Sequence, residues 1–357
     1  MIEDKGILIR NVYYMLSYAF QELRRNNYEY ISKEDFEYIQ DLFAEILYKG
    51  ISFQLKQGLY REYIERRDTL SVLRGKLDMK ETFRNRIKRH QVLSCEFDEL
   101  SEDNVFNQIL KTAAWLLIRE KSVSAKRKKH LKSLMPFFDG VSVIDPLSIH
   151  WDMLRSQRGN QTYKMLMNIC YFIMDGMLMT TDAGSYKMAK FSDDHMSRLF
   201  EKFVLEYYRF HHNELSPKPD HILWNITDSA EASIAFLPSM KTDITLHKGE
   251  RTLIIDTKYY GRMMQEQFDK QTVHSGNLYQ IFSYVKNLDK NNTGLVSGMI
   301  LYARTQEAVA PDLDAHFGLN RIMVRTLDLN QNFEGIKAQL DSIATYWTEE
   351  RSWNQSP

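Results

Sequence analysis

The segment LIIDTK, residues 253–258, constrains the fold of this 357-residue chain more than any other feature. Its consecutive apolar residues, Leu253 to Ile255, are typical of a strand that is buried on both faces. Charged side chains beside such a strand are costly to bury unless they are paired or bind a metal ion. The sequence therefore predicts a buried strand whose end holds Asp256 and Lys258 in a polar site.

A second strand precedes this one, and the Lys-Gly pair at 248–249 predicts a hairpin turn between the two. We expect His247 to pair with Glu250. Residues two apart share a face of a strand, so this register makes Asp243 and Asp256 diagonal neighbours on one face, with about 7 Å between their backbones. A one-residue bulge in the turn would separate the two acids.

Two carboxylates at that separation form a natural seat for Mg²⁺, which takes one or two carboxylates and fills its other positions with water and phosphate oxygens. Asp243 and Asp256 are the predicted metal ligands, and the carbonyl of Thr257 is a further one. Lys258 then reaches the attacking water and the scissile phosphate, where negative charge develops. The alternative is that these residues are solvated charges on an exposed sheet edge.

Three other residues are candidates for the same site. Gln280 and Tyr284 lie four residues apart on a predicted helix, so they share a face and can hydrogen-bond Lys258 or a DNA phosphate. A surface glutamine and a core tyrosine are the alternative. Glu201 would add a third carboxylate, although its setting in RLFEKF favours a surface pairing with lysine.

Periodicity organises the chain into an N-terminal domain, residues 1–185, and a C-terminal domain, residues 186–357. The first is predicted to be helical, with a β-rich insert over about 60–97 that forms a small sheet or barrel. The second reads as α-β-β-β-α-β, a mixed sheet with a helix on each face, and the whole chain is thus of the α+β or α/β class. The predicted elements are helices at 11–23, 36–47, 104–118, 163–177, 192–210, 274–286 and 335–347, and strands at 232–237, 242–247, 251–258, 296–302 and 321–326.

Composition excludes several classes of protein. Lys plus Arg and Asp plus Glu both total 47, so any nucleic acid must be bound through local patches of positive charge. The basic clusters at 84–90 and 126–132 are candidates for such patches. The alternative is that both are solvated helix faces. Cys95 and Cys170 form no CxxC, and no phosphate-binding glycine motif occurs, so a partner must supply any nucleotide energy. The charged start and the lack of a long apolar run predict no membrane segment and a cytoplasmic protein.

The sequence resembles the McrC family, the nuclease subunits of McrBC-type restriction systems, along nearly its whole length. The resemblance is carried by RNVYYMLSYA at 10–19, GKLDMKETFR, FDELSEDNVFNQILK, MKTDITL, IIDTKYY and HSGNLYQIFSY, in this order. It implies a PD-(D/E)xK restriction-endonuclease-like domain whose catalytic residues are Asp243, Asp256 and Lys258, with Gln280 as the helix glutamine.

The resemblance also implies an N-terminal domain that docks onto an McrB-like AAA+ GTPase hexamer and stimulates its GTP hydrolysis, while the partner binds the GTP and reads 5-methylcytosine. The expected function is a Mg²⁺-dependent endonuclease subunit that cleaves double-stranded DNA within a restriction system for antiviral defence. Two other hypotheses are a non-cleaving subunit that activates the motor and a stand-alone DNA repair nuclease. The intact Asp, Asp and Lys disfavour the first of these, and the long helical N-terminal region disfavours the second.

Overall fold

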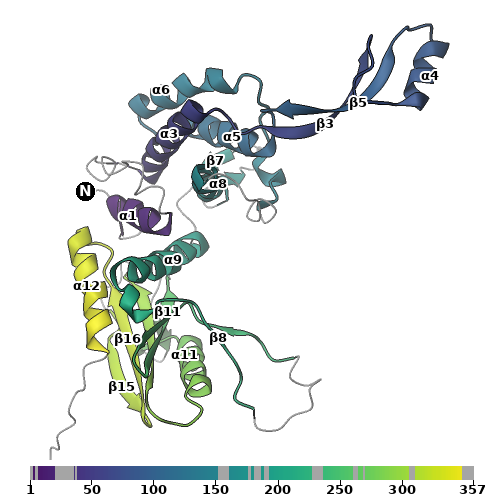
Figure 1. Cartoon of the computed structure of the whole chain (residues 1–357). Coiled ribbons are helices and arrows are strands. Elements are labelled where there is room, and N and C mark those ends of the chain that lie inside the picture. Colours follow the sequence, from purple (N-terminus) through teal and green to yellow (C-terminus); the bar gives the residue numbers. More distant parts are fainter. Residues whose placement is uncertain are drawn as a thin grey trace, which may run out of the picture. The chain divides into compact units, whose positions relative to one another are not determined.

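The computed structural model describes residues 3–4, 7–20, 36, 38–151, 161–175, 178–180, 186–188, 193–226, 236–259, 264–267, 270–304 and 310–347. It forms two compact units (Figure 1). Unit 1 consists of residues 1–42 and 189–357, and unit 2 of residues 43–188. The second boundary lies close to the predicted one, but residues 1–42 belong with the C-terminal part, which differs from their expected place in an N-terminal domain.

The first helix explains this grouping. Helix α1 (Ile9–Ala19) packs on α9 (Asp193–His211) within unit 1. The side-chain amide of Asn11 donates to the carbonyls of Leu329 and Gln331, both at 2.7 Å, and the ring of Tyr14 stacks on that of Phe333 at 4.1 Å. Almost the whole of α1 is buried, so the N-terminal helix completes the core of the C-terminal half.

The centre of unit 1 is a five-stranded mixed sheet with the order β10-β11-β14-β16-β15. Strands β11, β14 and β16 run parallel, and β10 and β15 pair antiparallel at the two edges. Helices α11 and α12 cover opposite faces of the sheet (Figure 1). The bounds are β10 Ile244–Lys248, β11 Arg251–Lys258, α11 Ser275–Leu288, β14 Val296–Ala303, β15 Leu313–Phe317, β16 Asn320–Leu327 and α12 Phe333–Tyr346.

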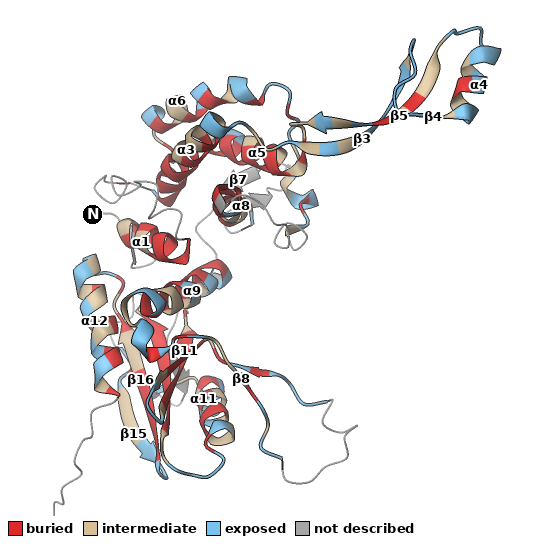
Figure 2. Cartoon of the chain, in the orientation of Figure 1, coloured by how far each residue is buried: buried red, intermediate tan, exposed pale blue. Residues whose placement is uncertain are grey.

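Burial of the two central strands confirms the reading of the apolar run. Every residue of β14 is buried, and β11 is buried from Thr252 to Thr257 (Figure 2). On the side facing α11, Ile254, Ile300 and Val324 pack against Ile281 of the helix. A Cβ at Gly298 would lie 2.7 Å from a side-chain carbon of Ile281, so glycine is what lets α11 approach the sheet closely.

Smaller elements complete unit 1. The predicted strand at 232–237 falls mostly outside the described residues, whereas β15 and the pair β12 and β13 had no counterpart in the sequence analysis. These smaller elements are β1 Glu3–Asp4, β2 Ile7–Leu8, η4 Asn213–Leu215, β8 His221–Ile222, β9 Met240–Lys241, β12 Met264–Gln267 and β13 Lys270–Val273.

Unit 2 is a group of helices from which one long arm projects (Figure 1). The helices are α3 Ile39–Gln57, whose first residues belong to unit 1, α5 Val105–Arg119, α6 Ala125–Leu134 and α8 Gln161–Met174, with η2 Met135–Phe138, η3 Pro146–Ser148 and the strands β6 Leu178–Thr180 and β7 Tyr186–Met188. The arm consists of β3 Glu62–Leu70, β4 Lys76–Leu77, α4 Met79–Ile87 and β5 Leu93–Ser101. It is the predicted β-rich insert, built as a three-stranded sheet of order β3-β5-β4 that carries a helix. No helix among the described residues has the length and apolar character needed to cross a membrane.

Candidate active site

The hairpin formed by β10 and β11 has a different register from the predicted one. Lys248 pairs with Arg251 and His247 with Thr252, so the expected pairing of His247 with Glu250 is wrong. The two-residue loop therefore consists of residues 249–250 instead of the predicted 248–249, and its first residue, Gly249, has a φ of +59°. Two-residue hairpin loops require a positive φ at this position, which glycine adopts without strain.

The difference amounts to two residues, so every side chain keeps the face that was predicted for it. The ladder ends with the pair Ile244 and Ile255, so Asp243 lies one residue before β10, and continuing the register would pair it with Asp256 instead of leaving the two acids diagonal. Asp243 is held by Thr257, whose backbone N–H and hydroxyl both donate to Asp243 Oδ2, at 2.7 and 2.8 Å. Asp243 thus contacts the residue that follows Asp256, and its negative charge acts on Asp256.

Asp256 lies at a buried position, not on an exposed sheet edge. Only 1% of the residue is accessible, and Lys258 Nζ lies 2.8 Å from Asp256 Oδ2. Burial raises the pKa of Asp256 to about 6; the positive charge of Lys258 opposes this rise in pKa, and the negative charge of Asp243 adds to it. The site therefore holds a carboxylate whose charge the protein alone does not fully stabilise.

Helix α11 supplies the next layer of contacts. Lys258 Nζ donates to Gln280 Oε1 at 3.2 Å, and Gln280 Nε2 donates to the hydroxyl of Tyr284 at 2.9 Å. That hydroxyl donates in turn to the backbone carbonyl of Lys241 at 3.2 Å, close in sequence to Asp243. The row of hydrogen bonds gives the Lys258 ammonium a second partner besides Asp256, and it brings both Gln280 and Tyr284 to the site.

Glu201 on α9 also belongs to this electrostatic environment. Helix α9 contacts β11. Burial raises the pKa of Glu201, the charge of Asp243 raises it further, and Asp256 acts in the same direction. Lys241 and Lys258 lower the pKa of Glu201. Sequence reasoning favoured a surface position for this residue, but its coupling to both acids favours membership of the site.

The described residues include no group of three or more His, Cys, Asp or Glu side chains arranged to hold a metal ion. The carboxylates of Asp243 and Asp256 nevertheless suit a hard cation that binds through one or two carboxylates and keeps its water. Their negative charges repel each other, which contributes to the raised pKa of Asp256. A divalent cation between them would offset this repulsion together with the burial of Asp256.

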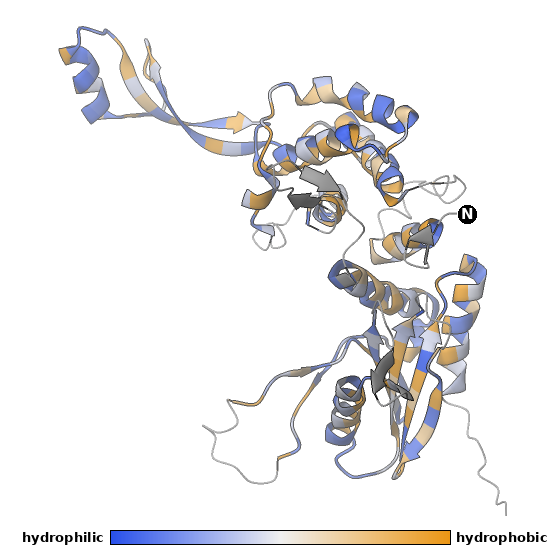
Figure 3. Ribbon diagram, turned by 180° about the vertical axis from the view of Figure 1, so that it is seen from behind, coloured by the Kyte–Doolittle hydropathy of each residue, from blue (hydrophilic) through white to orange (hydrophobic). Residues whose placement is uncertain are grey.

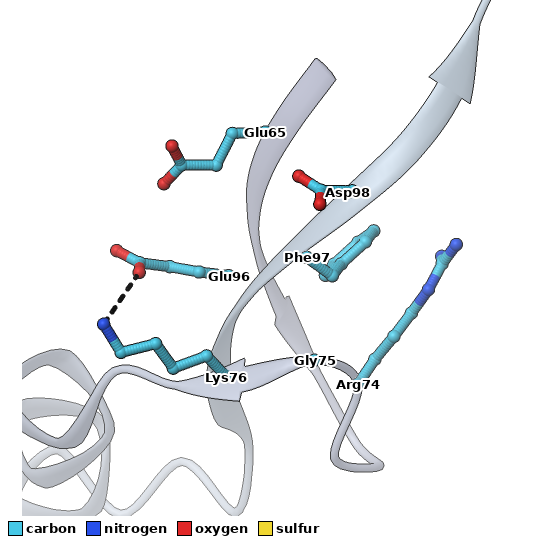
Figure 4. Close-up of a pocket in the computed structure, with 7 residues that line it drawn as sticks. All are labelled: Glu65, Arg74, Gly75, Lys76, Glu96, Phe97 and Asp98. Carbon is cyan, nitrogen blue, oxygen red and sulfur yellow. Dashed lines mark ion pairs between the residues drawn. The ribbon is translucent and has the colours of Figure 1, made fainter. Parts of the chain in front are cut away.

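A second hollow, of about 600 Å³, lies on the arm (Figure 4). It is lined by charged residues of both signs and by the ring of Phe97. The guanidinium of Arg74 lies over that ring at 4.0 Å, and Lys76 forms an ion pair with Glu96 at 3.9 Å. At Gly75 a Cβ would come within 2.3 Å of the carbonyl oxygen of Glu96, so the crossing of the strands here requires glycine.

Fold and site together define the class of protein: a mixed α/β protein with two carboxylates and a lysine at the end of its central hairpin. The family model for the McrBC 5-methylcytosine restriction system component matches residues 4–303. The match covers more than half of the chain, which therefore belongs to this family.

Two individual proteins are similar to this chain. The Type IV methyl-directed restriction enzyme EcoKMcrBC of Escherichia coli (strain K12) is 28% identical over 313 residues, which are 86% of this chain and 89% of that protein. A chain of the refined half-complex from the tetradecameric assembly of Thermococcus gammatolerans McrB AAA+ hexamers with bound McrC matches with a TM-score of 0.51 and 20% identity, over 94% of this chain and 76% of that chain. This second likeness shows the fold.

Proposed function

We propose that this chain is the DNA-cleaving subunit of a modification-dependent restriction system, and that unit 1 is a PD-(D/E)xK nuclease domain. The observation that carries the proposal is the grouping of three charged side chains: Asp243 is bonded to Thr257 beside Asp256, and Lys258 Nζ lies 2.8 Å from Asp256 Oδ2. Membership of the McrBC component family supports it. A purely regulatory subunit would have no need of a buried acid with a raised pKa.

The roles of the residues follow from their contacts. Asp243 and Asp256 would hold Mg²⁺, with the Thr257 carbonyl as a further ligand, and the ion would supply Lewis acidity at the phosphate and acidify a water molecule. Lys258 compensates part of the charge of Asp256 in the free protein and would provide positive charge for the phosphate oxygens as they gain charge in the transition state. Gln280 positions Lys258 through its 3.2 Å hydrogen bond.

We assign Glu201 the role of a third carboxylate. Its raised pKa reflects burial and the nearby charges of Asp243 and Asp256, so the residue stays within electrostatic range of the proposed ion. A carboxylate beside an attacking water can accept its proton or hold it through a hydrogen bond. Glu201→Gln keeps the shape of the side chain and removes its charge. We expect this variant to need a higher Mg²⁺ concentration for half-maximal cleavage than the parent protein.

The arm is the surface we assign to the partner. It carries large apolar side chains that are more than half exposed, and exposed apolar clusters on soluble proteins usually mark contact sites. These side chains are Tyr63, Val72, Leu73, Met79, Phe83 and Ile87. The solved assembly described above contains McrB AAA+ hexamers with bound McrC. We propose that this chain likewise assembles with an McrB-like AAA+ GTPase, which binds GTP and recognises the modified base.

The test is a cleavage assay on methylated and unmethylated duplex DNA, with Mg²⁺ and GTP, with and without the partner. Asp256→Ala should remove cleavage by the assembled complex and leave the partner's GTPase stimulation unchanged, because the substitution lies in unit 1 and far along the chain from the arm. Phe83→Ala combined with Ile87→Ala is the complementary control, which should reduce GTPase stimulation. Continued cutting by the Asp256 variant would show that the reaction takes place at another site.

A further inference from the structure

Helix α6 presents a concentration of positive charge that the proposed functions do not use. Its sequence is AKRKKHLKSL, which contains no acidic residue. The buried residues Arg127, Leu131 and Leu134 define the side of the helix that faces the rest of unit 2. Most residues of the helix are hydrophilic, as its colouring in Figure 3 indicates, and the exposed ones lie away from the buried side. The cations of α6 therefore divide into an inward and an outward set.

The inward cation has a structural explanation. Arg127 is 7% exposed, and its Nε lies 3.5 Å from a carboxylate oxygen of Glu45 on α3. A buried guanidinium needs such a partner, since an uncompensated buried charge is strongly destabilising. Nearby, the ring of His130 stacks on that of Tyr48 at 4.7 Å. These contacts hold α6 in a fixed orientation.

The outward set has no such explanation. Lys126, Lys129 and Lys132 are exposed and follow one another at intervals of three residues, so they lie along one side of the helix. At 1.5 Å per residue they span about 9 Å of the helix axis. Within the part of the chain that the structure describes, none of the three forms an ion pair with a carboxylate. The chain as a whole has equal numbers of acidic and basic residues, so this excess is local.

The other basic cluster of unit 2 differs in character. On α4 of the arm, Arg84 pairs with Glu81, and the cations alternate with the exposed apolar side chains of Phe83 and Ile87. Such a mixed surface suits a protein partner. The outward side of α6 carries no exposed large apolar residue, so only its charge is available for recognition. A row of lysines without apolar neighbours suits a polyanion with evenly spaced charges.

We propose that the outward side of α6 binds the sugar–phosphate backbone of double-stranded DNA, as a contact in unit 2 that is separate from the cleavage site in unit 1. The inference rests on the proposed function only in taking DNA as the polyanion. Lysine contacts with phosphates carry no sequence information, and they contribute affinity through the release of counterions. The contact would therefore hold DNA of any sequence.

The experiment measures binding of the full chain to a fluorescent DNA duplex by anisotropy, in EDTA, over a range of salt concentrations. The variant Lys126→Gln/Lys129→Gln/Lys132→Gln removes three charges and keeps good helix-forming residues. Each lost phosphate contact lowers the slope of log affinity against log salt by about 0.9, so the triple variant should lose about 2.7 from the slope. Between 50 and 200 mM salt, the parent should then lose about 40-fold more affinity than the variant.

Two matched proteins complete the design. Replacing the same three lysines by arginine keeps the charge and should restore the parental slope. Lys80→Gln/Arg86→Gln/Lys88→Gln removes equal charge from exposed positions on the arm and should leave the slope unchanged. An unaltered slope in the α6 variant, as expected if that side meets an acidic protein or only water, would overturn the inference, as would an equal loss in the arm variant. Binding is measured in EDTA, where no Mg²⁺-dependent cleavage takes place, so a failure of the cleavage proposal is detected separately by the cleavage assay described above.

Discussion

Two carboxylates of the central sheet show opposite solutions to the burial of charge. Asp314 on β15 accepts hydrogen bonds from Arg321 Nε and Nη2, both at 2.8 Å, and from the hydroxyl of Tyr346, also at 2.8 Å. These hydrogen bonds hold the pKa of Asp314 well below its ordinary value, and those from Arg321 make the largest contribution. Asp256 on β11 has Lys258 as its charged neighbour, is acted on by the negative charge of Asp243, and has a pKa raised to about 6.

We interpret the difference as that between a charge with a structural role and a charge in the proposed active site. The donors around Asp314 neutralise it completely, so the cluster joins β15, β16 and α12 and leaves no capacity for a ligand. At Asp256 the protein supplies too few donors, and the energetic penalty remains until something else provides positive charge. Strongly perturbed carboxyls of this second kind concentrate at active sites. The following predictions contrast the two clusters, beginning with the largest expected effect.

Removing the cation should have different consequences at the two positions. Lys258→Ala should lower cleavage by the assembled complex about 10²–10³-fold, because it removes the positive charge that faces the reacting phosphate. Arg321→Ala should leave the cleavage rate of the folded protein unchanged and lower its stability. The measurements are single-turnover cleavage and urea denaturation on both variants. A comparable cleavage defect in both would mean that the two clusters do not differ in function.

Removing the acid should change the free energy of unfolding with opposite signs. Asp314→Asn should lower it by about 2 kcal/mol, since hydrogen bonds to a charged group are lost. Asp256→Asn should raise it by on the order of 2 kcal/mol at neutral pH, because the folded protein no longer buries a carboxylate whose pKa is about two units above the ordinary value. Urea denaturation without added metal measures both. Equal destabilisation by the two substitutions would remove the distinction.

The dependence of these differences on pH follows from the sign of each pKa shift. For Asp256 the folded pKa is raised to about 6, so the penalty is absent near pH 4, grows as the pH rises toward 6 and is constant above. The stability gained by Asp256→Asn should follow that course. For Asp314 the folded pKa is lowered, so its contribution is complete above about pH 4 and is lost as the pH falls further. Denaturation of parent and variants at several pH values tests both.

The smallest effect concerns the helix that positions the lysine. Gln280→Ala removes the acceptor of the Lys258 ammonium and should lower cleavage about tenfold, as do other losses of a residue that orients a catalytic group. Tyr284→Phe removes only the hydroxyl that holds Gln280, and a smaller loss is expected. The Mg²⁺ concentration for half-maximal cleavage should stay unchanged in both, which distinguishes positioning from metal binding.

Much of the fold of unit 1 could be predicted because the information is local. The apolar run before Asp256 predicted a buried strand, and the two-residue period of a strand predicted that Asp256 and Lys258 lie on one side of it. The register of the hairpin was less accessible, since it depends on the positive φ of Gly249, which makes residues 249–250 the two-residue loop instead of 248–249. The site survived that error because a shift by two residues preserves the faces of a strand.

Contacts between distant parts of the chain could not be predicted. Nothing local to Asn11 indicates that its amide will donate to the carbonyl of Leu329, 318 residues away. For the same reason the sequence left Glu201 as a candidate third carboxylate with a surface position favoured, because RLFEKF is also what a surface helix would contain. The signal available for Glu201 was its position on the apolar-flanked side of α9, next to the buried Phe200.

The grouping of α1 with the C-terminal half also changes how the units can be separated. A fragment that starts at residue 186 would lose the helix whose Tyr14 stacks on Phe333 and whose Asn11 binds the loop before α12. A nuclease fragment should therefore retain residues 1–42 and join them by a short linker to residue 189. Such a construction leaves out unit 2 without exposing the core of unit 1.

Unit 1 takes its first helix from the start of the chain and its last helix from near the end. During synthesis the ribosome makes α1 before the whole of unit 2, and α9, on which α1 packs, is made only afterwards. The core that α1 shares with α9 therefore cannot form until unit 2 has been translated. The order of the chain thus delays the completion of the proposed nuclease domain until the segment from residue 189 onward has been made.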